Sequence, residues 1–414
     1  MAKTDAIVLG AGIVGTSIAL HLKKRALEVA LVDVRDPGQG TSYGNAGVIE
    51  GNTLFPHAFP SGLSLWHIAI KQASEANYHL SFLPWIASWL WDYRRNTTIE
   101  GSLEYAKLMR PLFANALSEH EQLMAESNAT GYLRKTGWLK LYRTEDVYKA
   151  TERERNLATQ LKLPFRVVDA NGARALEPAL GQGIGCAIHW EGAASVSNPL
   201  AVTQAYVTRF AALGGGVFTG NAHTLRRGGN LWRVHTEQGE IEATAAVIAL
   251  GPWAPDVLEP MGIKLPLAVK RGYHWHFQPR GNAGLSRPVV DVEYGYCVAP
   301  MDQGLRITTG AEFARRDAPA TPAQFGRLLP AANKMFPLGE PLELSPWLGS
   351  RPCFADSRPV IGKAPGQTGL WLAYGHAHWG LTLGPVTGRL VADMMTGAQP
   401  FCDPTPYSAE RFAA

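Results

Sequence analysis

Cysteine is scarce in this chain of 414 residues, and the four cysteines lie far apart: Cys186, Cys297, Cys353 and Cys402. Their spacing gives neither a zinc-ligand pattern nor a Cys-x-x-Cys pair, so we predict no metal site and no disulfide reductase activity. No apolar run reaches the ~20 residues that a transmembrane helix needs. The formal charge of +4 comes without a long run of lysine or arginine, so nucleic acid is not an expected partner. These absences predict a globular protein of the reducing cytoplasm.

The N-terminal segment has the pattern of a strand, a glycine turn, a helix and a second strand. Its turn and helix start contain Gly10, Gly12, Ile13, Val14 and Gly15. In such a motif Gly10 allows the tight turn, Gly12 lets the backbone approach a pyrophosphate, and Gly15 lets the helix pack closely on the strand. The helix N-terminus then offers free N–H groups and a favourable dipole to phosphate. The motif predicts a dinucleotide site.

Asp33 ends the second strand of this motif. A carboxylate at that position can accept hydrogen bonds from both hydroxyls of an adenosine ribose and would repel a 2′-phosphate. The pattern alone leaves NAD and FAD open, and the absence of a second such motif predicts one dinucleotide. The next segment is small and polar, and we expect a loop beneath an extended cofactor. Its candidate contacts are Thr41, Ser42, Asn45, Ala46 and Gly47.

Residues 57–95 are unusually aromatic for a soluble protein. They hold four tryptophans and end in two arginines: Trp66, Trp85, Trp89, Trp91, Arg94 and Arg95. Such a stretch can lie in a membrane interface or can form helices that pack on a second domain. We favour packing, because aromatic helices are more often core than anchor.

Apolar spacing predicts the other main elements. Helices are expected at 103–128, from Glu145, and from Pro199 to Leu213 with Ser197 or Asn198 as N-cap. A further helix is expected from about Pro385. Residues 262–313 alternate in the manner of strands and predict a mixed sheet over a pocket.

Three separated segments resemble one family. They are the glycine motif with Ser42-Tyr43-Gly44-Asn45-Ala46-Gly47, the stretch from Gly349-Ser350-Arg351-Pro352 to Pro359-Val360-Ile361-Gly362, and Gly375-His376 with Gly380-Leu381-Thr382. Together they are similar to the FAD-dependent D-amino-acid oxidoreductases, which include D-amino-acid oxidase, glycine oxidase and the bacterial D-amino-acid dehydrogenases. The asparagine-alanine-glycine loop and the aromatic stretch most resemble the bacterial dehydrogenases.

The resemblance implies an α/β fold in which a Rossmann-like FAD-binding domain and a mixed-sheet α+β substrate domain interleave. The FAD-binding domain is expected in residues 1–56, 191–261 and 345–414, and the substrate domain in 57–190 and 262–344. It also implies non-covalent FAD. Further cofactor contacts are expected at Gly251, Gly375, Gly380, Leu381 and Thr382.

Arg351 is the first candidate for the substrate site, since the resemblance implies that the arginine of Gly-x-Arg-Pro holds the substrate carboxylate. A planar guanidinium makes two parallel hydrogen bonds to a carboxylate, although an interdomain ion pair is the alternative. The resemblance adds a tyrosine to the same carboxylate, and Tyr296 fits best, with Tyr294 as its rival. His376 and His378 flank the turn before the last helix, where both substrate contact and a core position stay open.

The expected function is oxidative deamination of D-amino acids, or of cyclic imino acids such as proline derivatives. By resemblance, a hydride leaves Cα for flavin N5, and a quinone, a carrier protein or another acceptor takes the electrons. The alternatives are a sarcosine- or glycine-type amine oxidase and a flavin subunit of an electron-relay complex. Residues 57–95 offer a peripheral contact with the inner face of the membrane. Cys353 falls near the position where related monomeric sarcosine oxidases attach flavin, but we expect a free core thiol there.

Overall fold

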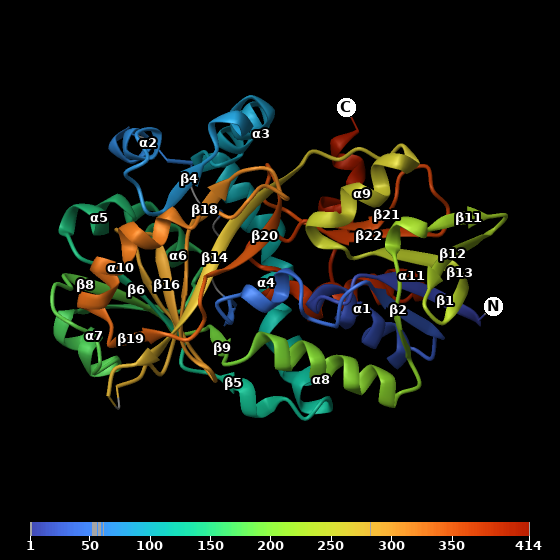
Figure 1. Ribbon diagram of the computed structural model, residues 1–414, viewed down its shortest axis with the longest axis horizontal. Coiled ribbons are helices and arrows are strands. Elements are labelled where there is room, and N and C mark those ends of the chain that lie inside the picture. The colour runs from blue at the N-terminus through green and yellow to red at the C-terminus, as the bar shows by residue number, and fades with distance from the viewer. Residues whose placement is uncertain (1, 52–55, 57–58, 61, 282, 414) are drawn as a thin grey trace.

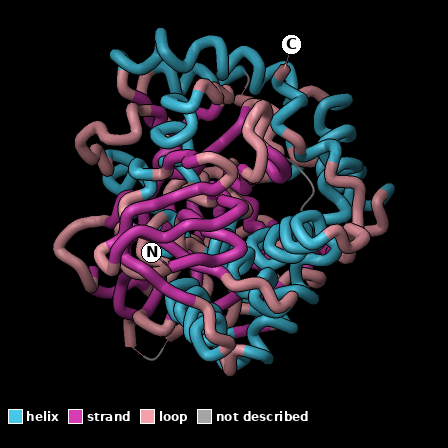
Figure 2. Tube along the Cα trace, turned by 90° about the vertical axis from the view of Figure 1, so that its right-hand side faces the viewer, coloured by secondary structure: helices cyan, strands magenta, loops and turns pink. Residues whose placement is uncertain are grey.

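The computed structural model describes residues 2–413 apart from 52–55, 57–58, 61 and 282. Two sheets lie side by side along the long axis of the molecule, and both termini lie in the half that contains the first sheet (Figure 1). In the perpendicular view of Figure 2, strands occupy the middle of the molecule and helices lie around them. This arrangement confirms the α/β class.

The first sheet has eight strands in the described chain, in the order β10-β2-β1-β13-β12-β11, with β22 beside β13 and β21 beside β22. Its strands are β1 (Ala2–Leu9), β2 (Val29–Asp33), β10 (Gly216–Thr219), β11 (Arg226–Gly228), β12 (Leu231–Thr236), β13 (Gly239–Ile248), β21 (Val360–Lys363) and β22 (Leu370–Tyr374). Strands β10, β2, β1, β13 and β22 are parallel neighbours. The apolar residues of β1, β2 and β22 are buried because helices cover the sheet, whereas β10 lies at the edge and leaves Val217 exposed.

Four helices form a layer on one face of the first sheet, while α9 (Ala254–Leu258) lies on the other (Figure 1). The layer consists of α1 (Ile13–Lys24), α4 (Ile99–Glu126), α8 (Pro199–Ala212) and α11 (Gly380–Thr396). Helix α11 packs on both α1 and α4. The approach of α11 to α1 requires glycine, because a Cβ at Gly388 would lie 2.7 Å from the backbone of Ser17.

The second sheet has eleven strands in the same described residues, in the order β4-β18-β14-β17-β16-β15-β6-β8-β7, and β19 and β20 also pair with β14. Its strands are β4 (Ala76–Tyr78), β6 (Trp138–Tyr142), β7 (Phe165–Asp169), β8 (Cys186–Trp190), β14 (Leu267–Pro279), β15 (Val289–Asp291), β16 (Tyr296–Met301), β17 (Gly304–Thr308), β18 (Ala311–Phe313), β19 (Leu338–Pro341) and β20 (Trp347–Phe354). Its surroundings include α2 (Gly62–Ala69), α3 (Leu83–Asn96), α5 (Glu145–Ala150), α6 (Glu152–Gln160), α7 (Ala170–Leu176) and α10 (Ala323–Met335). A small sheet of β3 (Val48–Ile49), β5 (Leu133–Arg134) and β9 (Ala194–Val196) lies between them.

Several predicted boundaries differ from the structure. Helix α8 has the predicted cap, with Asn198 Oδ1 accepting from the Ala201 amide at 3.0 Å. Helix α11 begins at Gly380 rather than near Pro385, and the helix expected from Glu145 is interrupted at Thr151. The segment after β2 contains a 3₁₀ turn at Thr41–Gly44.

The two predicted domain ranges do not coincide with the two sheets. Strand β20, assigned to the FAD-binding range 345–414, pairs with β14 in the second sheet. Helix α4, assigned to the substrate range, packs on α11 in the layer of the first sheet. The division into an FAD-binding and a substrate domain therefore stays a prediction, with β20 and α4 crossing it.

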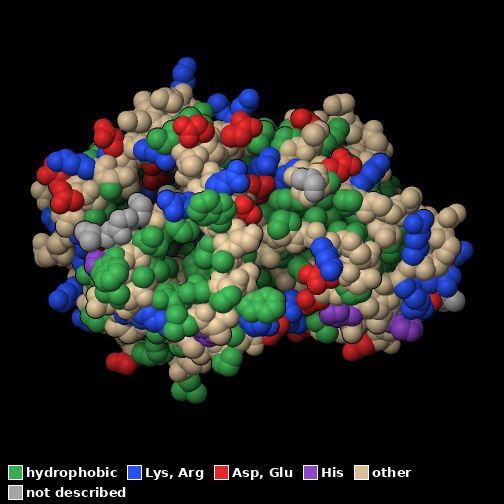
Figure 3. Space-filling model, turned by 90° about the horizontal axis from the view of Figure 1, so that it is seen from above, with side chains coloured by type: hydrophobic (Ala, Val, Ile, Leu, Met, Phe, Trp, Pro, Cys, Tyr) green, Lys and Arg blue, Asp and Glu red, His purple; other side chains and the backbone are tan. Residues whose placement is uncertain are grey.

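The aromatic stretch packs only in part as we favoured, because Ile86, Trp89 and Tyr93 are buried. Of its four tryptophans, Trp66, Trp85 and Trp91 are 61%, 72% and 62% exposed. Residues 57, 58 and 61 of this stretch lie outside the described residues. Figure 3 views the molecule from the side of α2 and α3 and shows hydrophobic side chains gathered there among lysines and arginines. We call this the apolar surface; it consists of Leu65, Trp66, Ile70, Leu80, Trp85 and Trp91.

None of the described helices combines the length and the apolar character that a membrane span requires. The residues of the apolar surface lie on α2, on α3 and in the segment between them, which also contains β4.

Three buried histidines surround α11. His120 Nε2 lies 2.8 Å from the Leu381 carbonyl oxygen and His376 Nε2 lies 3.0 Å from Thr387 Oγ1, while His21 contacts the backbone of Pro385. Burial lowers the pKa of His21 and of His376 to about 3 and that of His120 to about 4, from the ordinary 6.5. All three are neutral in the fold at pH 7.

We expect acid to destabilise the fold through these histidines. Below pH 6.5 the unfolded chain takes up protons that the folded chain excludes until about pH 4 or 3, so stability present above pH 6.5 is lost as the pH falls. The loss is up to about 1.4 kcal/mol per pH unit for each histidine. Urea unfolding at pH 7.5 and pH 5.5 measures it, and equal free energies of unfolding would contradict this account.

Candidate active site

The glycine turn after β1 forms a tight cradle. Gly10 has a φ of +105°, and a Cβ there would lie 2.5 Å from the Ala249 carbonyl oxygen. A Cβ at Gly15 would lie 1.8 Å from the Gly10 oxygen, so the helix can approach the turn only with glycine. Gly12 is the N-cap of α1, and since it has no side chain it accepts no capping hydrogen bond from the helix amides. The cradle is thus built as the sequence predicted, with a helix N-terminus directed at its opening.

Asp33 and Ser42 complete the cradle. Asp33 Oδ2 accepts from the Ala11 amide at 2.7 Å and Oδ1 from the Arg35 amide at 3.0 Å, which fixes the carboxylate at the end of β2. Each oxygen keeps further acceptor capacity for ribose hydroxyls. Ser42 Oγ accepts from the Ile13 amide at 3.0 Å and closes the turn.

The loop after β2 is tied to the second sheet and contacts the small sheet at Gly47. Thr41 Oγ1 donates to the Ser350 carbonyl on β20, and Asn45 Oδ1 accepts from the Gly47 amide. Gly47 has a φ of +77°, and a Cβ there would meet the Val196 carbonyl at 2.3 Å. From β17, Arg306 donates to the carbonyls of Tyr43 and Asn45, at 2.8 and 2.7 Å. The loop is therefore held rigidly between the sheets.

One cavity of about 1310 Å³ joins this cradle to the second sheet. At the cradle its lining includes Gly10, Gly12, Ile13, Val14, Asp33, Thr41, Ser42, Asn45, Ala46 and Gly251. At the N-terminus of α11 its lining includes Gly375, His376, His378, Gly380, Leu381 and Thr382. The volume exceeds that of most single-ligand pockets and fits an extended dinucleotide with a small substrate beside it.

The N-terminus of α11 faces the cavity. Gly375 has a φ of +84°, and a Cβ there would meet the Phe354 ring at 2.3 Å. Thr382 Oγ1 donates to the Val48 carbonyl and accepts from the Glu50 amide, which joins α11 to β3. The helix dipole and the free amides at this end favour negative charge in the cavity.

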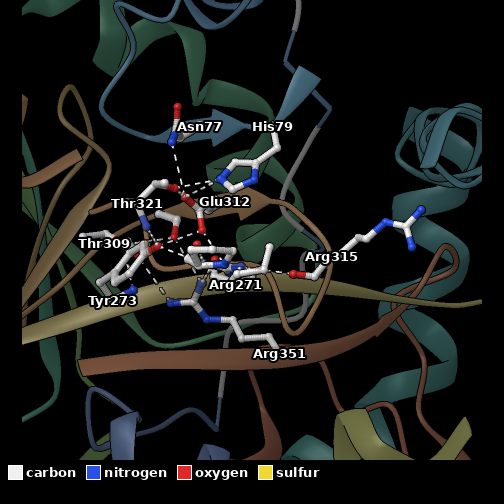
Figure 4. Close-up of polar contacts among 12 residues, drawn as sticks. Asn77, His79, Arg271, Tyr273, Thr309, Glu312, Arg315, Thr321 and Arg351 are labelled. Atoms are coloured by element: carbon white, nitrogen blue, oxygen red, sulfur yellow. Dashed lines mark hydrogen bonds and ion pairs between the residues drawn. The ribbon is translucent and has the colours of Figure 1, made fainter. Parts of the chain in front are cut away.

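Arg351 reaches the cavity from β20 (Figure 4). Its guanidinium donates to three backbone carbonyls: Thr309 at 3.1 Å, Gly310 at 3.1 Å and Arg271 at 3.4 Å. No carboxylate in the described part of the chain pairs with it. Burial lowers the pKa of Arg351, yet an arginine stays charged at neutral pH. Arg351 therefore brings to the cavity a positive charge that no described carboxylate neutralises by direct pairing.

Gly272 makes room for this guanidinium. A Cβ at Gly272 on β14 would lie 2.3 Å from Arg351 Nη1. The arginine consequently lies flat on the backbone of the neighbouring strand, which holds the plane of its donors.

A buried ion pair supports the carbonyls that hold Arg351. Arg271 Nε lies 2.9 Å from Glu312 Oε2, and neither side chain is exposed. The Tyr273 hydroxyl donates to the same carboxylate at 2.8 Å, and Thr321 donates to its other oxygen (Figure 4). Because Glu312 is on β18 and Arg271 on β14, the pair fixes the strands on either side of the guanidinium.

The structure does not bring Tyr296 to Arg351. The Tyr296 hydroxyl donates to Asp291 Oδ2 at 3.0 Å, and Arg143 pairs with the same carboxylate. The guanidinium of Arg143 also lies over the Tyr294 ring, 4.8 Å from its centroid. Since the only hydroxyl proton of Tyr296 is used within the protein, nothing here supports either tyrosine as a carboxylate ligand.

His376 and His378 have different surroundings. His376 also lines the cavity, but it is buried against Thr387, which favours a core position over substrate contact. His378 lines the cavity and lies edge-on to Trp379. Cys353 is a buried free thiol, and burial raises its pKa, so it is a poor nucleophile.

Sequence reasoning missed Lys270 and Tyr93. Lys270 pairs with Arg351 in the β14–β20 register, and its ammonium lies 3.7 Å from the centroid of the Tyr93 ring. Both residues line the cavity. The sequence shows the lysine but does not show the partner strand that places it beside Arg351.

Comparisons with known proteins agree with this geometry. The sequence profile of the family described as FAD dependent oxidoreductase (DAO) matches residues 5–394. The chain is 28% identical to a D-amino-acid oxidase of Bradyrhizobium diazoefficiens over 98% of each protein. It is 29% identical to a D-amino acid dehydrogenase of Cereibacter sphaeroides over 99% of this chain and 95% of that protein. Glycine oxidase from Geobacillus kaustophilus has a similar fold, with a TM-score of 0.73 at 22% identity over 99% of this chain and 98% of that one.

The chain belongs to the FAD dependent oxidoreductase (DAO) family. Its cofactor is accordingly FAD, which the glycine cradle, Asp33 and the long cavity fit. We propose that the pyrophosphate would lie at the N-terminus of α1 and the ribose at Asp33, and that the N-terminus of α11 would suit the ring end.

Proposed function

We propose that this protein oxidises D-amino acids, including cyclic imino acids, at Cα. The observation that supports the proposal is the Arg351 guanidinium, a half-buried cation that lines the cavity and pairs with no carboxylate of the described residues. Such a group binds a substrate carboxylate through two parallel hydrogen bonds. The relatives named D-amino-acid oxidase and D-amino acid dehydrogenase support the substrate class.

The chain's own contribution is mainly orientation. Arg351 holds the carboxylate, and the carbonyls behind its guanidinium keep that cation from turning. FAD, when bound, supplies the acceptor for the two electrons that leave Cα. The amides at the N-terminus of α11 stabilise negative charge at that end of the cavity. Water then hydrolyses the imine product to a 2-oxo acid and ammonia, whereas a cyclic substrate keeps its nitrogen in the ring.

Product analysis tests this function. Purified protein with a D-amino acid and an artificial quinone should form the 2-oxo acid and ammonia in equal amounts. Turnover of glycine or sarcosine alone would overturn the proposal in favour of a secondary-amine oxidase. No turnover of any amine would favour the electron-relay subunit. Hydrogen peroxide formed in step with substrate loss would show that oxygen, not a quinone, takes the electrons.

We further propose that the apolar surface contacts a lipid bilayer, where a quinone acceptor resides. Three exposed tryptophans on two neighbouring helices suit the interfacial region. Exposed cations flank them: Lys71, Arg94, Arg95 and Arg315, the last stacked on Trp85 at 4.8 Å. These charges complement anionic lipid.

Replacing Trp66, Trp85 and Trp91 together with serine is expected to lower binding to anionic vesicles by about tenfold or more. In the wild type, each indole would move from water into the interfacial region of the bilayer on binding, and serine would not gain that free energy. Vesicle flotation measures the binding. Turnover with a soluble dye acceptor should stay unchanged, and unchanged flotation would contradict the contact.

A further inference from the structure

The cavity face of the β14–β20 pair carries a pattern that Arg351 alone does not explain. Residues opposite one another in an antiparallel pair point to the same side. On the side of Arg351 the pairs are Ala268 with Cys353, Lys270 with Arg351, Gly272 with Gly349, and His274 with Trp347. Lys270 and Arg351 therefore lie side by side on this face, and the neighbouring pair, Gly272 and Gly349, has no side chains.

Lys270 is buried with no acidic partner. Its residue is 6% exposed. Its ammonium lies against two aromatic faces, 3.7 Å from the centroid of the Tyr93 ring and 5.1 Å from that of the Trp89 ring. Among the described residues no carboxylate forms an ion pair with it, although Glu50 and Glu75 also line the cavity. A buried ammonium is costly unless an anion or strong acceptors meet it.

Other buried or half-buried cations have their own partners. Arg271 pairs with Glu312 at 2.9 Å, Arg287 with Glu177 at 2.8 Å and Arg411 with Asp356 at 2.8 Å. Arg306 is buried without a carboxylate, but it donates to His276 and to the carbonyls of Tyr43 and Asn45. Of these cations, Lys270 and Arg351 are the two that line the cavity. Their shared feature indicates a ligand with two negative groups.

We propose that Lys270 determines specificity by binding the second carboxylate of a dicarboxylic D-amino acid. This inference rests on the proposed function, in which Arg351 holds the first carboxylate. The Cα atoms of opposed residues in an antiparallel pair are about 5 Å apart. The carboxylates of aspartate and glutamate are separated by two or three carbons, which suits two cations on neighbouring strands. The rings of Tyr93 and Trp89 lie against the ammonium, and Lys270 lines the cavity.

The test compares substrates in one variant. In Lys270→Met, kcat/KM for D-aspartate and D-glutamate should fall by roughly 30-fold or more, mainly through KM. The values for D-alanine and D-methionine should change less than about threefold. Lys270→Arg should keep most of the preference because it keeps the charge. Lys264→Met, an exposed lysine before the same strand, is the matched control and should change nothing.

Inhibitor binding provides a readout without turnover and without a variant. In the wild type, succinate should compete with D-alanine more tightly than butyrate does, by about tenfold or more. Equal inhibition by the two acids would overturn the proposal. An equal fall in kcat/KM for all substrates in Lys270→Met would also overturn it, because Lys270 would then contact a group that all substrates share. So would an unchanged kcat/KM for every substrate, because Lys270 would then be a packing residue.

The two proposals fail differently. If no D-amino acid is oxidised, the proposed function is wrong. If D-alanine is oxidised but Lys270→Met does not selectively lower kcat/KM for D-aspartate and D-glutamate, only the specificity inference is wrong.

Discussion

Replacing Arg351 with alanine is expected to lower kcat/KM for D-amino acids about 100-fold or more while FAD stays bound. Loss of one partner from a buried charge pair corresponds to about 2–5 kcal/mol. The effect should fall mainly on KM, because Arg351 binds the substrate carboxylate. FAD should stay bound, because Arg351 does not line the cradle around Gly12. Steady-state kinetics and the flavin absorbance of the purified variant measure the two properties separately.

Arg315→Ala is the control for this variant. Arg315 lies near the same cluster, but its side chain extends away from it toward Trp85 (Figure 4). It should leave KM unchanged with a soluble acceptor. An Arg351→Ala enzyme with an unchanged KM would remove Arg351 from the substrate site.

Replacing Gly12 with valine is expected to weaken FAD binding by about 100-fold, which corresponds to about 2.7 kcal/mol. Gly12 has φ −71° and ψ 177°, which any residue adopts, and a Cβ there meets only Ser42 Oγ, at 3.2 Å. The fold should therefore tolerate the change. The side chain would occupy the space through which a pyrophosphate reaches the N-terminus of α1.

The flavin-to-protein absorbance ratio and the melting temperature of the apoprotein check this prediction. Gly326→Val, on the exposed face of α10 where a Cβ meets no atom within 4 Å, is the control. Full FAD occupancy in Gly12→Val would mean that the phosphates do not lie at this turn.

The cradle could be predicted from sequence because its determinants are local. Gly10, Gly12 and Gly15 fix a turn between elements that are neighbours in the chain, and Asp33 follows at the end of the next strand. The cap of α8 at Asn198 is local in the same way. Arg351 was identified through its motif, and the structure places it in the cavity.

The remainder of the site depends on strand pairing, which the sequence does not display. Lys270 and Arg351 become neighbours only through the β14–β20 register. Tyr296 lines the cavity and stays a prediction as a ligand, but its hydroxyl donates a hydrogen bond to Asp291 on an adjacent strand, a contact that the sequence does not display. Aromatic composition likewise could not reveal that Trp66 and Trp85 lie on the outer faces of their helices.

The most direct test of the central claim is anaerobic reduction of the flavin by the two enantiomers of one amino acid. With D-alanine and L-alanine at equal concentration, the account predicts that the D-enantiomer bleaches the flavin absorbance and that the L-enantiomer does so far more slowly. Preferential bleaching by the L-enantiomer, or none by either enantiomer and none by any other D-amino acid, would contradict it.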